Sequence, residues 1–171
     1  LDDAERAGVA AAEIAAERAR AMLGTSSTLV WHQKYRPMIK WLHRALEQAE
    51  VAADRASEAH AYYLLDWALG EIGDPMAEHY QRLAQPIYEE LGDYTGLANV
   101  LNNLGVTSFG VGRWDECTHF MEDSLRARRR AGDVVGMAQC SHNLAEVLGE
   151  QGRFEDAELH LREARRVWRS S

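Results

Sequence analysis

The sequence has little proline and cysteine, and no long uninterrupted run of apolar residues. Three of its 171 residues are proline, whereas alanine, leucine, glutamate and arginine are abundant. These four residue types lose little free energy on entering a helix, so the composition favours helices over strands. The two cysteines, Cys117 and Cys140, are too few for a disulfide framework, which favours a reducing compartment and predicts a cytoplasmic protein.

Positive charge is also scarce, since 19 Lys and Arg face 27 Asp and Glu for a net charge of -8. Affinity for nucleic acid depends on cations that neutralise phosphates, so we expect no nucleic-acid partner. The apolar stretch over residues 7–23 is interrupted by four charged residues and predicts neither a membrane span nor a signal peptide, so we expect no membrane partner. The start at Leu1 rather than methionine indicates a piece excised from a larger protein.

An internal repeat is present, because residues 98–117 align without gaps on residues 138–157 at a displacement of 40 residues. A fixed period of this length is typical of helical repeat proteins. We therefore expect one domain over residues 1–171, with a degenerate unit at about 1–56 and further units at 57–96, 97–136 and 137–171. Matches in this register include Asn103/Asn143, Leu104/Leu144, Gly112/Gly152, Arg113/Arg153, Gly92/Gly132, Asp93/Asp133 and Gly96/Gly136.

Each unit has the pattern of a helix, a turn and a second helix. Leu97, Leu101 and Leu104 recur at helical spacing, glycines at 110 and 112 end that helix, and a second helix is predicted from Trp114 to about residue 131. In the first unit we expect a helix over residues 3–23, a loop over residues 24–28 and a helix starting near Pro37. The predicted fold class is all-α, an α-solenoid of about four antiparallel helix pairs and about eight helices.

The Leu104-Gly105 and Leu144-Ala145 pairs and the turns at 112–114 and 152–154 resemble the tetratricopeptide repeat, in a variant longer than the usual period of about 34 residues. The strings VLNNLGVTSFGVGRWDEC, RRRAGDVVGMAQCSHNLAEVLGEQGRFEDAE and LREARRVW resemble the C-terminal repeat region of multidomain bacterial adenylate/guanylate cyclases. This resemblance implies a non-catalytic regulatory module that binds a protein or peptide, with any class III cyclase activity in the rest of the parent protein. Similar repeats occur in ATPase-coupled transcriptional regulators, which is the alternative.

In a solenoid of helix pairs, the first helix of each pair lines the concave face, which is the predicted binding groove. Asparagine amides can pair with a peptide backbone without reading sequence, and aromatic rings provide contact area at little entropic cost. The alternative is that Asn103 and Asn143 only satisfy neighbouring helices. The predicted groove residues are Tyr62, Tyr63, Asp66, Asn99, Asn102, Asn103, Phe109, Gln139, His142, Asn143 and Glu146.

Other domains of the parent chain are further candidate partners for the groove. A homodimer through the C-terminal edge is a further hypothesis, because Leu161, Val167 and Trp168 on the last predicted helix lack a following helix that would cover them. Artificial truncation of a longer array is the alternative.

The sequence predicts no catalytic residue, metal site or cofactor. The closest Cys/His pairs are two residues apart, Cys117 with His119 and Cys140 with His142, and residues at that spacing face different directions on a helix. We therefore expect both cysteines to be small packing residues. The basic run over residues 126–130 is interpreted as a solvated helix C-terminus, where cations complement the helix dipole.

Overall fold

The computed structural model describes residues 3–170 and the side chains of residues 8–169. Within residues 3–170 it contains eight α-helices and no strand, which confirms the predicted all-α fold class and number of helices. The helices are α1 (Asp3–Val30), α2 (Tyr35–Ala52), α3 (Arg55–Glu71), α4 (Ala77–Leu91), α5 (Tyr94–Gly110), α6 (Trp114–Ala131), α7 (Val134–Glu150) and α8 (Phe154–Ser170).

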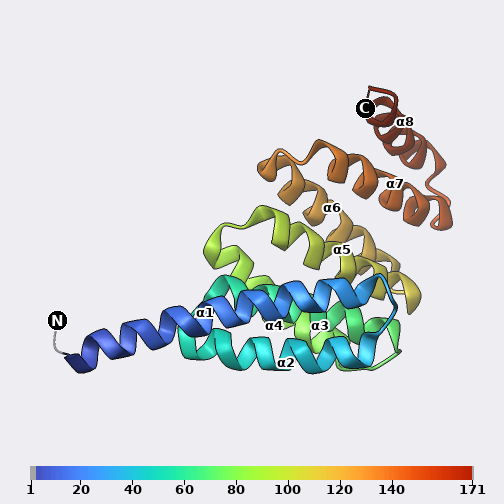
Figure 1. Cartoon of the computed structure of the whole chain (residues 1–171). Coiled ribbons are helices and arrows are strands. Elements are labelled where there is room, and N and C mark those ends of the chain that lie inside the picture. Colours follow the sequence, from blue (N-terminus) through green and yellow to red (C-terminus); the bar gives the residue numbers. More distant parts are fainter. Residues whose placement is uncertain (1–2, 171) are drawn as a thin grey trace. The chain divides into compact units, whose positions relative to one another are not determined.

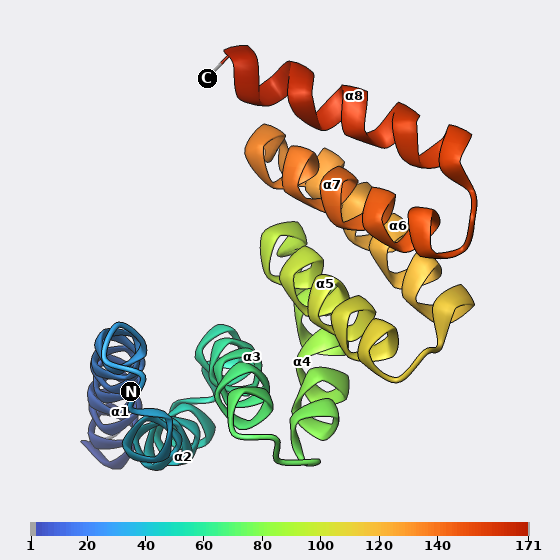
Figure 2. The ribbon, with the colours of Figure 1, turned by 90° about the vertical axis from the view of Figure 1, so that its right-hand side faces the viewer.

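The chain divides into two compact units, residues 1–87 and residues 88–171, and the boundary lies inside α4. In the first unit α1 and α2 lie side by side and antiparallel (Figure 1), and α3 packs on both of them. In the second unit α5 with α6 and α7 with α8 form two antiparallel pairs (Figure 2), joined by contacts between α6 and α7. Each unit therefore has its own set of packed helices.

Apolar stripes on the helices form a separate core in each unit. Met38, Leu42 and Leu65 are fully buried in the first unit, as are Met121 and Leu144 in the second. Burying a side chain of this size contributes about 1.5–3 kcal/mol before the entropic costs of folding. The helix faces that are not used in these cores remain available for contact with solvent or partners.

The joint between successive pairs is built from a glycine, an aspartate and a second glycine. Gly132 ends α6 with a φ of 70°, in the left-handed region that disfavours other residues, and the Asp133 carboxylate then accepts a hydrogen bond of 2.8 Å from the Gly136 amide. Asp93 accepts the same bond from the Gly96 amide at 2.9 Å. The 40-residue register therefore corresponds to a repeated cap.

The prediction of a loop over residues 24–28 is wrong, because α1 continues through them to Val30. The hydroxyl groups of this segment donate to backbone carbonyls one turn earlier, for example Ser26 to Met22 at 2.9 Å. Gly and hydroxyl residues are typical of loops, but here the hydroxyls are satisfied by the helix itself. The chain reverses instead at residues 31–34, and α2 begins at Tyr35, close to the predicted Pro37.

Candidate functional site

The candidate site is formed by α5 and α7, which are the first helices of the two pairs in the second unit. Together they present a surface that carries both polar and apolar side chains. Leu101 and Leu104 on α5, and Leu144 and Leu148 on α7, point into the protein and are buried. The opposite faces carry the residues that we call the α5–α7 surface, which are Asn102, Val106 and Phe109 of α5 and His142, Asn143 and Glu146 of α7. All six are half-buried or exposed.

Two asparagines join the two helices of this surface. The Asn143 side-chain amide donates a hydrogen bond of 3.1 Å to the Asn102 side-chain oxygen, across 41 positions of sequence. This bond uses one polar atom of each amide. The Nδ2 of Asn102 and the Oδ1 of Asn143 have no hydrogen-bond partner among the described residues, so a donor and an acceptor remain for a ligand.

A cavity of about 200 Å³ adjoins Asn143 on the same surface. Val106 and Phe109 of α5, Met121 of α6 and Val147 of α7 provide its apolar lining, and Asn143 and Glu146 provide the polar lining. This volume suits one apolar side chain rather than a whole small-molecule ligand, since sites for such ligands measure about 300–1,000 Å³. Sequence reasoning missed Met121 and Val147, because both occupy core positions of their helices and nothing in the pattern shows that they border a cavity.

The polar rim of the cavity is acidic. Glu146 is exposed, and its carboxylate lies 3.5 Å from the His142 imidazole, an ion pair only when that histidine is protonated. The His142 ring also packs edge-on against Trp168 of α8, with ring centroids 5.6 Å apart. His142 is therefore oriented by α8 on one side and by Glu146 on the other, and the net charge beside the cavity is zero or negative.

The other predicted groove residues of this unit have different environments. The Asn99 oxygen accepts a hydrogen bond of 3.0 Å from Arg128, whose guanidinium also pairs with Asp133 at 2.7 Å, so Asn99 is part of the joint between the helix pairs. Gln139 is exposed on α7, and Asn103 is half-buried on α5. The structure thus brings Asn102, Phe109, Asn143 and Glu146 together but assigns Asn99 a structural contact.

The three predicted groove residues on α3 belong to the other compact unit. Tyr62 stacks on Tyr80 of α4 with ring centroids 5.9 Å apart, and burial followed by the nearby Glu58 carboxylate raises the pKa of its hydroxyl. Tyr63 packs against the core of that unit. Asp66 requires a correction, because it is buried and accepts a hydrogen bond of 2.6 Å from Gln81, so it cannot contact a ligand at the surface.

The cysteines lie as interpreted from the sequence, but the basic run is solvated only in part, because the Arg128 side chain is 12% exposed and pairs with Asp133. Cys117 and Cys140 are fully buried, and burial raises the pKa of both thiols, which keeps them protonated and unreactive. Arg128, Arg129 and Arg130 occupy the last turn of α6. Among the described residues there is no group of three or more His, Cys, Asp or Glu side chains arranged to hold a metal ion.

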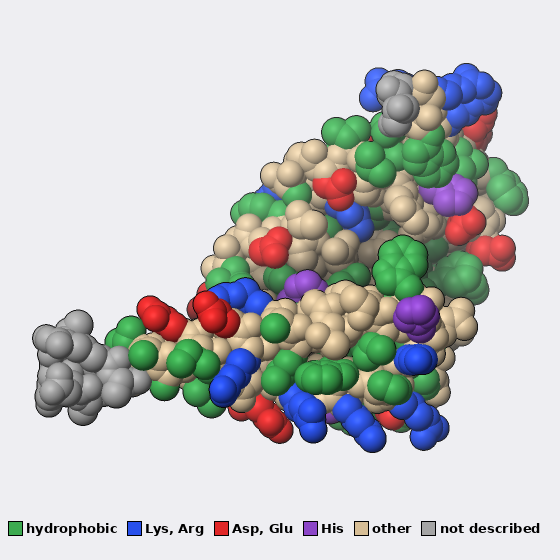
Figure 3. Space-filling model, viewed as in Figure 1, with side chains coloured by type: hydrophobic (Ala, Val, Ile, Leu, Met, Phe, Trp, Pro, Cys, Tyr) green, Lys and Arg blue, Asp and Glu red, His purple; other side chains and the backbone are tan. Residues whose placement is uncertain are grey.

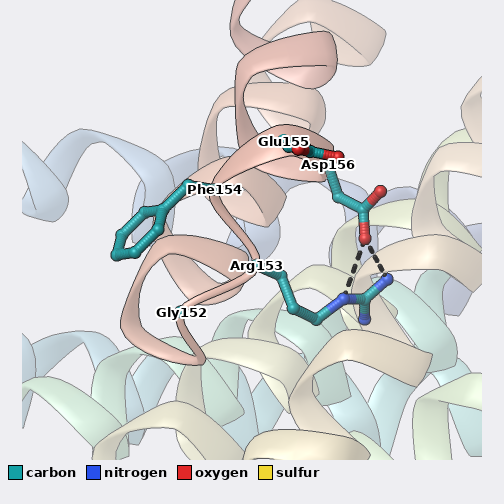
Figure 4. A pocket seen from close by; sticks show the side chains of 5 residues that line it. All are labelled: Gly152, Arg153, Phe154, Glu155 and Asp156. Carbon is teal, nitrogen blue, oxygen red and sulfur yellow. Dashed lines mark hydrogen bonds and ion pairs between the residues drawn. The ribbon is translucent and has the colours of Figure 1, made fainter.

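A second cavity lies at the turn before α8 and is lined by residues 152–156 (Figure 4). Two guanidinium nitrogens of Arg153 donate to one carboxylate oxygen of Asp156, at 2.9 and 2.6 Å, and Phe154 points away from this pair. The charge of the arginine is therefore neutralised within the turn. The cavity offers a ligand the exposed Phe154 ring, the Glu155 carboxylate and the helix start.

Comparison with known proteins finds a repeat family whose model matches most of the second unit. The family described as Tetratricopeptide repeat matches residues 96–170, which include nearly all of α5–α8. No curated protein matches the chain. Helices long and apolar enough to cross a membrane are absent from the described part of the chain.

A solved structure supports the same fold. The chain is similar to the crystal structure of BtubC (BKLC) from P. vanneervenii, with 22% sequence identity and a TM-score of 0.72 over 80% of this chain and 57% of that chain. The present chain thus spans little more than half of that protein. These findings support the tetratricopeptide-like α-solenoid fold.

Proposed function

We propose that the α5–α7 surface binds an extended peptide segment of a partner protein or of another domain of the parent chain. The observation that carries this proposal is the Asn102–Asn143 amide pair beside an apolar cavity. A buried structural amide pair would have all of its polar atoms satisfied within the protein. Here a donor and an acceptor are left at the surface next to space for a side chain.

The chemistry of the surface defines the ligand further. The free donor of Asn102 and the free acceptor of Asn143 can pair with the backbone C=O and N–H of one residue of an extended peptide, which does not depend on the ligand's sequence. The neighbouring cavity can accept a single Leu, Met or Phe side chain. Because Glu146 is exposed at its rim, a Lys or Arg beside this apolar anchor is favoured.

We further propose that the module regulates a bacterial cytoplasmic signalling protein, a multidomain adenylate/guanylate cyclase. The strings quoted from residues 100–168 support this parent, and an ATPase-coupled transcriptional regulator is the alternative. The domains encoded beside the repeats distinguish the two, since only one of them contains a cyclase domain. The homodimer through α8 is retained as a proposal supported by Leu161 and Trp168, which are 44% and 50% exposed.

The test is selection of binders from a library of random 12-residue peptides, followed by affinity measurements on variants. Asn143→Ala removes the acceptor and is expected to weaken binding five- to tenfold. Val106→Trp fills the cavity from an exposed position and is expected to weaken binding at least tenfold, about 1.4 kcal/mol. Glu122→Ala on the exposed face of α6 is the matched control and is expected to leave the affinity unchanged. Selected peptides whose affinity is insensitive to both variants would refute the proposed site.

A further inference from the structure

Charge is distributed unevenly along the chain. Residues 18–46 contain six of the 19 Lys and Arg, including both lysines of the protein, and none of the 27 Asp and Glu. This segment covers the second half of α1, the reversal at residues 31–34 and most of α2. A chain with a net charge of -8 thus contains one extended basic segment, which lies in the first compact unit.

The cations of α2 form a row on its solvent face. Arg36, Lys40 and Arg44 recur every fourth residue and are exposed, whereas Met38 and Leu42 on the opposite face are fully buried. The row extends over about 12 Å at 1.5 Å per residue. Figure 3 shows Lys and Arg side chains gathered along the lower edge of the molecule, where α2 runs in Figure 1.

The cations of the row have no carboxylate partner within the part of the chain that the structure describes. Lys34, Arg36, Lys40 and Arg44 make no ion pair there, whereas arginines elsewhere, such as Arg55 and Arg162, pair with a carboxylate three or four residues away. The first carboxylate after the row on α2 is Glu47, which follows Arg44 by three residues and lies beyond the end of the row.

Two tryptophans adjoin the row. Trp31, at the reversal before α2, is 87% exposed, so it contributes almost nothing to the core. Trp41 is half-buried on α2, and the Arg44 guanidinium lies 5.4 Å from the centre of its ring. Tryptophan and arginine are the side chains most enriched among residues that dominate protein–protein binding energies. The exposed indole and the unpaired cations together have the composition of a binding surface.

We propose that the basic α2 surface, which consists of Trp31, Lys34, Arg36, Lys40, Trp41 and Arg44, docks a short acidic protein segment. The carboxylates of that segment would lie along the row at the spacing of one helical turn, and an apolar side chain of the segment would cover Trp31. This surface is distinct from the α5–α7 surface and does not depend on the function proposed for that surface.

The short footprint favours a protein segment over other polyanions. The solvent face of α2 becomes acidic after Arg44, with Glu47 and Glu50 both exposed. A membrane of anionic lipids or a nucleic acid strand would extend past the row and meet these carboxylates. An acidic segment of two or three helical turns matches the row and ends before them.

The experiment uses the full chain and a fluorescein-labelled 16-residue helical peptide that carries three Glu four residues apart, which span about 12 Å, and one Leu beside them. A twin peptide with Gln in place of each Glu is the first control. We expect the Glu peptide to bind, the Gln peptide to bind at least tenfold more weakly, and the affinity for the Glu peptide to fall as salt increases. Equal binding of the two peptides, or no binding of the Glu peptide, would overturn the proposal.

Variants then locate the contact. The triple variant Arg36→Gln, Lys40→Gln, Arg44→Gln is expected to bind the Glu peptide at least tenfold more weakly, and Trp31→Ala at least threefold. The matched control removes the same charge from α8 with Arg165→Gln, Arg166→Gln and Arg169→Gln and is expected to change the affinity less than twofold. Circular dichroism verifies that each variant is folded.

Two further probes separate the classes of partner. Vesicles of phosphatidylcholine and phosphatidylserine at a 7:3 ratio and a 20-nucleotide oligothymidylate are tested on the same proteins. Neither is expected to bind the chain as tightly as the Glu peptide. Tighter binding of either probe that is lost in the α2 triple variant would overturn the assignment to a protein segment, as would equal sensitivity of the α8 control.

Discussion

At the scale of single residues, the joint between helix pairs depends on the aspartate that follows its first glycine. Asp93 and Asp133 cap α5 and α7 through the same backbone hydrogen bond. Only Asp133 also pairs with Arg128, whose side chain is 12% exposed. Substitutions at the two positions therefore separate the contribution of the cap to stability from that of the ion pair.

Replacement of these aspartates by alanine is expected to cost different amounts. Asp93→Ala loses a cap, which is worth about 1 kcal/mol. Asp133→Ala loses the cap and also leaves the Arg128 guanidinium without its carboxylate, so we expect about 2 kcal/mol in total. Urea unfolding at pH 7 measures both. Equal losses for the two variants would show that the Arg128 pair is not stabilising.

The stability difference between wild type and Asp133→Ala also depends on pH. The hydrogen bond from Gly136, and then the Arg128 guanidinium, lower the pKa of Asp133 in the folded protein. The ionised carboxylate thus stabilises the folded state above the ordinary aspartate pKa of about 3.9, and this contribution disappears as pH falls through the lowered value. Unfolding curves between pH 7 and pH 3 are expected to converge. A difference that grows on acidification would contradict the sign of the shift.

Gly105 and Met121 illustrate how one repeat differs from the next. A Cβ at Gly105 would lie 2.7 Å from the Met121 terminal methyl, so Gly105→Ala is expected to destabilise the protein by about 1–2 kcal/mol. The equivalent positions one repeat later are Ala145 and Leu161. We therefore expect Met121→Leu to restore most of the loss in the double variant, as measured by thermal unfolding. Additive losses would exclude this compensation.

At the scale of secondary structure elements, α1 shows where local propensity was overridden. Gly24 and the following hydroxyl residues are typical of a loop, yet the helix passes through them because Ser26 is fully buried and its hydroxyl bonds to the Met22 carbonyl. The apolar residues after them, Leu29 and Val30, pack on the core of the first unit. The free energy gained from this packing exceeds the small free-energy cost of placing glycine and hydroxyl residues in a helix.

The same glycine-to-alanine change is expected to have opposite effects in two elements. Gly24→Ala in the interior of α1 meets no atom within 4 Å and is expected to stabilise by about 0.5–1 kcal/mol. Gly132→Ala at the end of α6 is expected to destabilise by about 1 kcal/mol or more, because its φ of 70° strains any residue with a Cβ. The melting temperatures of the two variants relative to wild type test this. A lower melting temperature for Gly24→Ala would indicate that α1 is not helical at this position.

At the scale of the whole molecule, the two compact units lead to a prediction about fragments. A fragment of residues 74–171 contains all of α4–α8 and the complete α5–α7 surface. We expect it to unfold cooperatively and to bind selected peptides within about twofold of the whole chain, as measured by circular dichroism and fluorescence anisotropy. Tenfold weaker binding by a folded fragment would show that the first unit contributes to the site.

The repeat period determined most of what could be predicted of the fold. The glycines and aspartates at 92–96 and 132–136 mark the joints directly, so the C-terminal end of α6 was predicted correctly. The start of α6 at Trp114 was predicted correctly as well. An equivalent joint at residues 53–57 was missed. Ala53 adopts a φ of 52° there and Asp54 caps Ser57, so the geometry recurs without either glycine.

The candidate site was predictable only in part. Helical spacing identifies which residues of α5 and α7 share a face, which led to Asn102 and Asn143 as groove residues, and both are half-buried. It does not reveal that Asp66 has a partner in Gln81, because that bond joins two helices whose relative rotation is set by packing. For the same reason, spacing within one helix could not reveal the cavity formed by three helices.

The most direct test of the account is an NMR titration of the isotopically labelled chain with a peptide selected from the random library. If the α5–α7 surface is the binding site, the side-chain amide signals of Asn102 and Asn143 shift together with the backbone signals of Val106 and Phe109. Shifts confined to α6 and α8, or side-chain amides that do not respond at saturation, would contradict it.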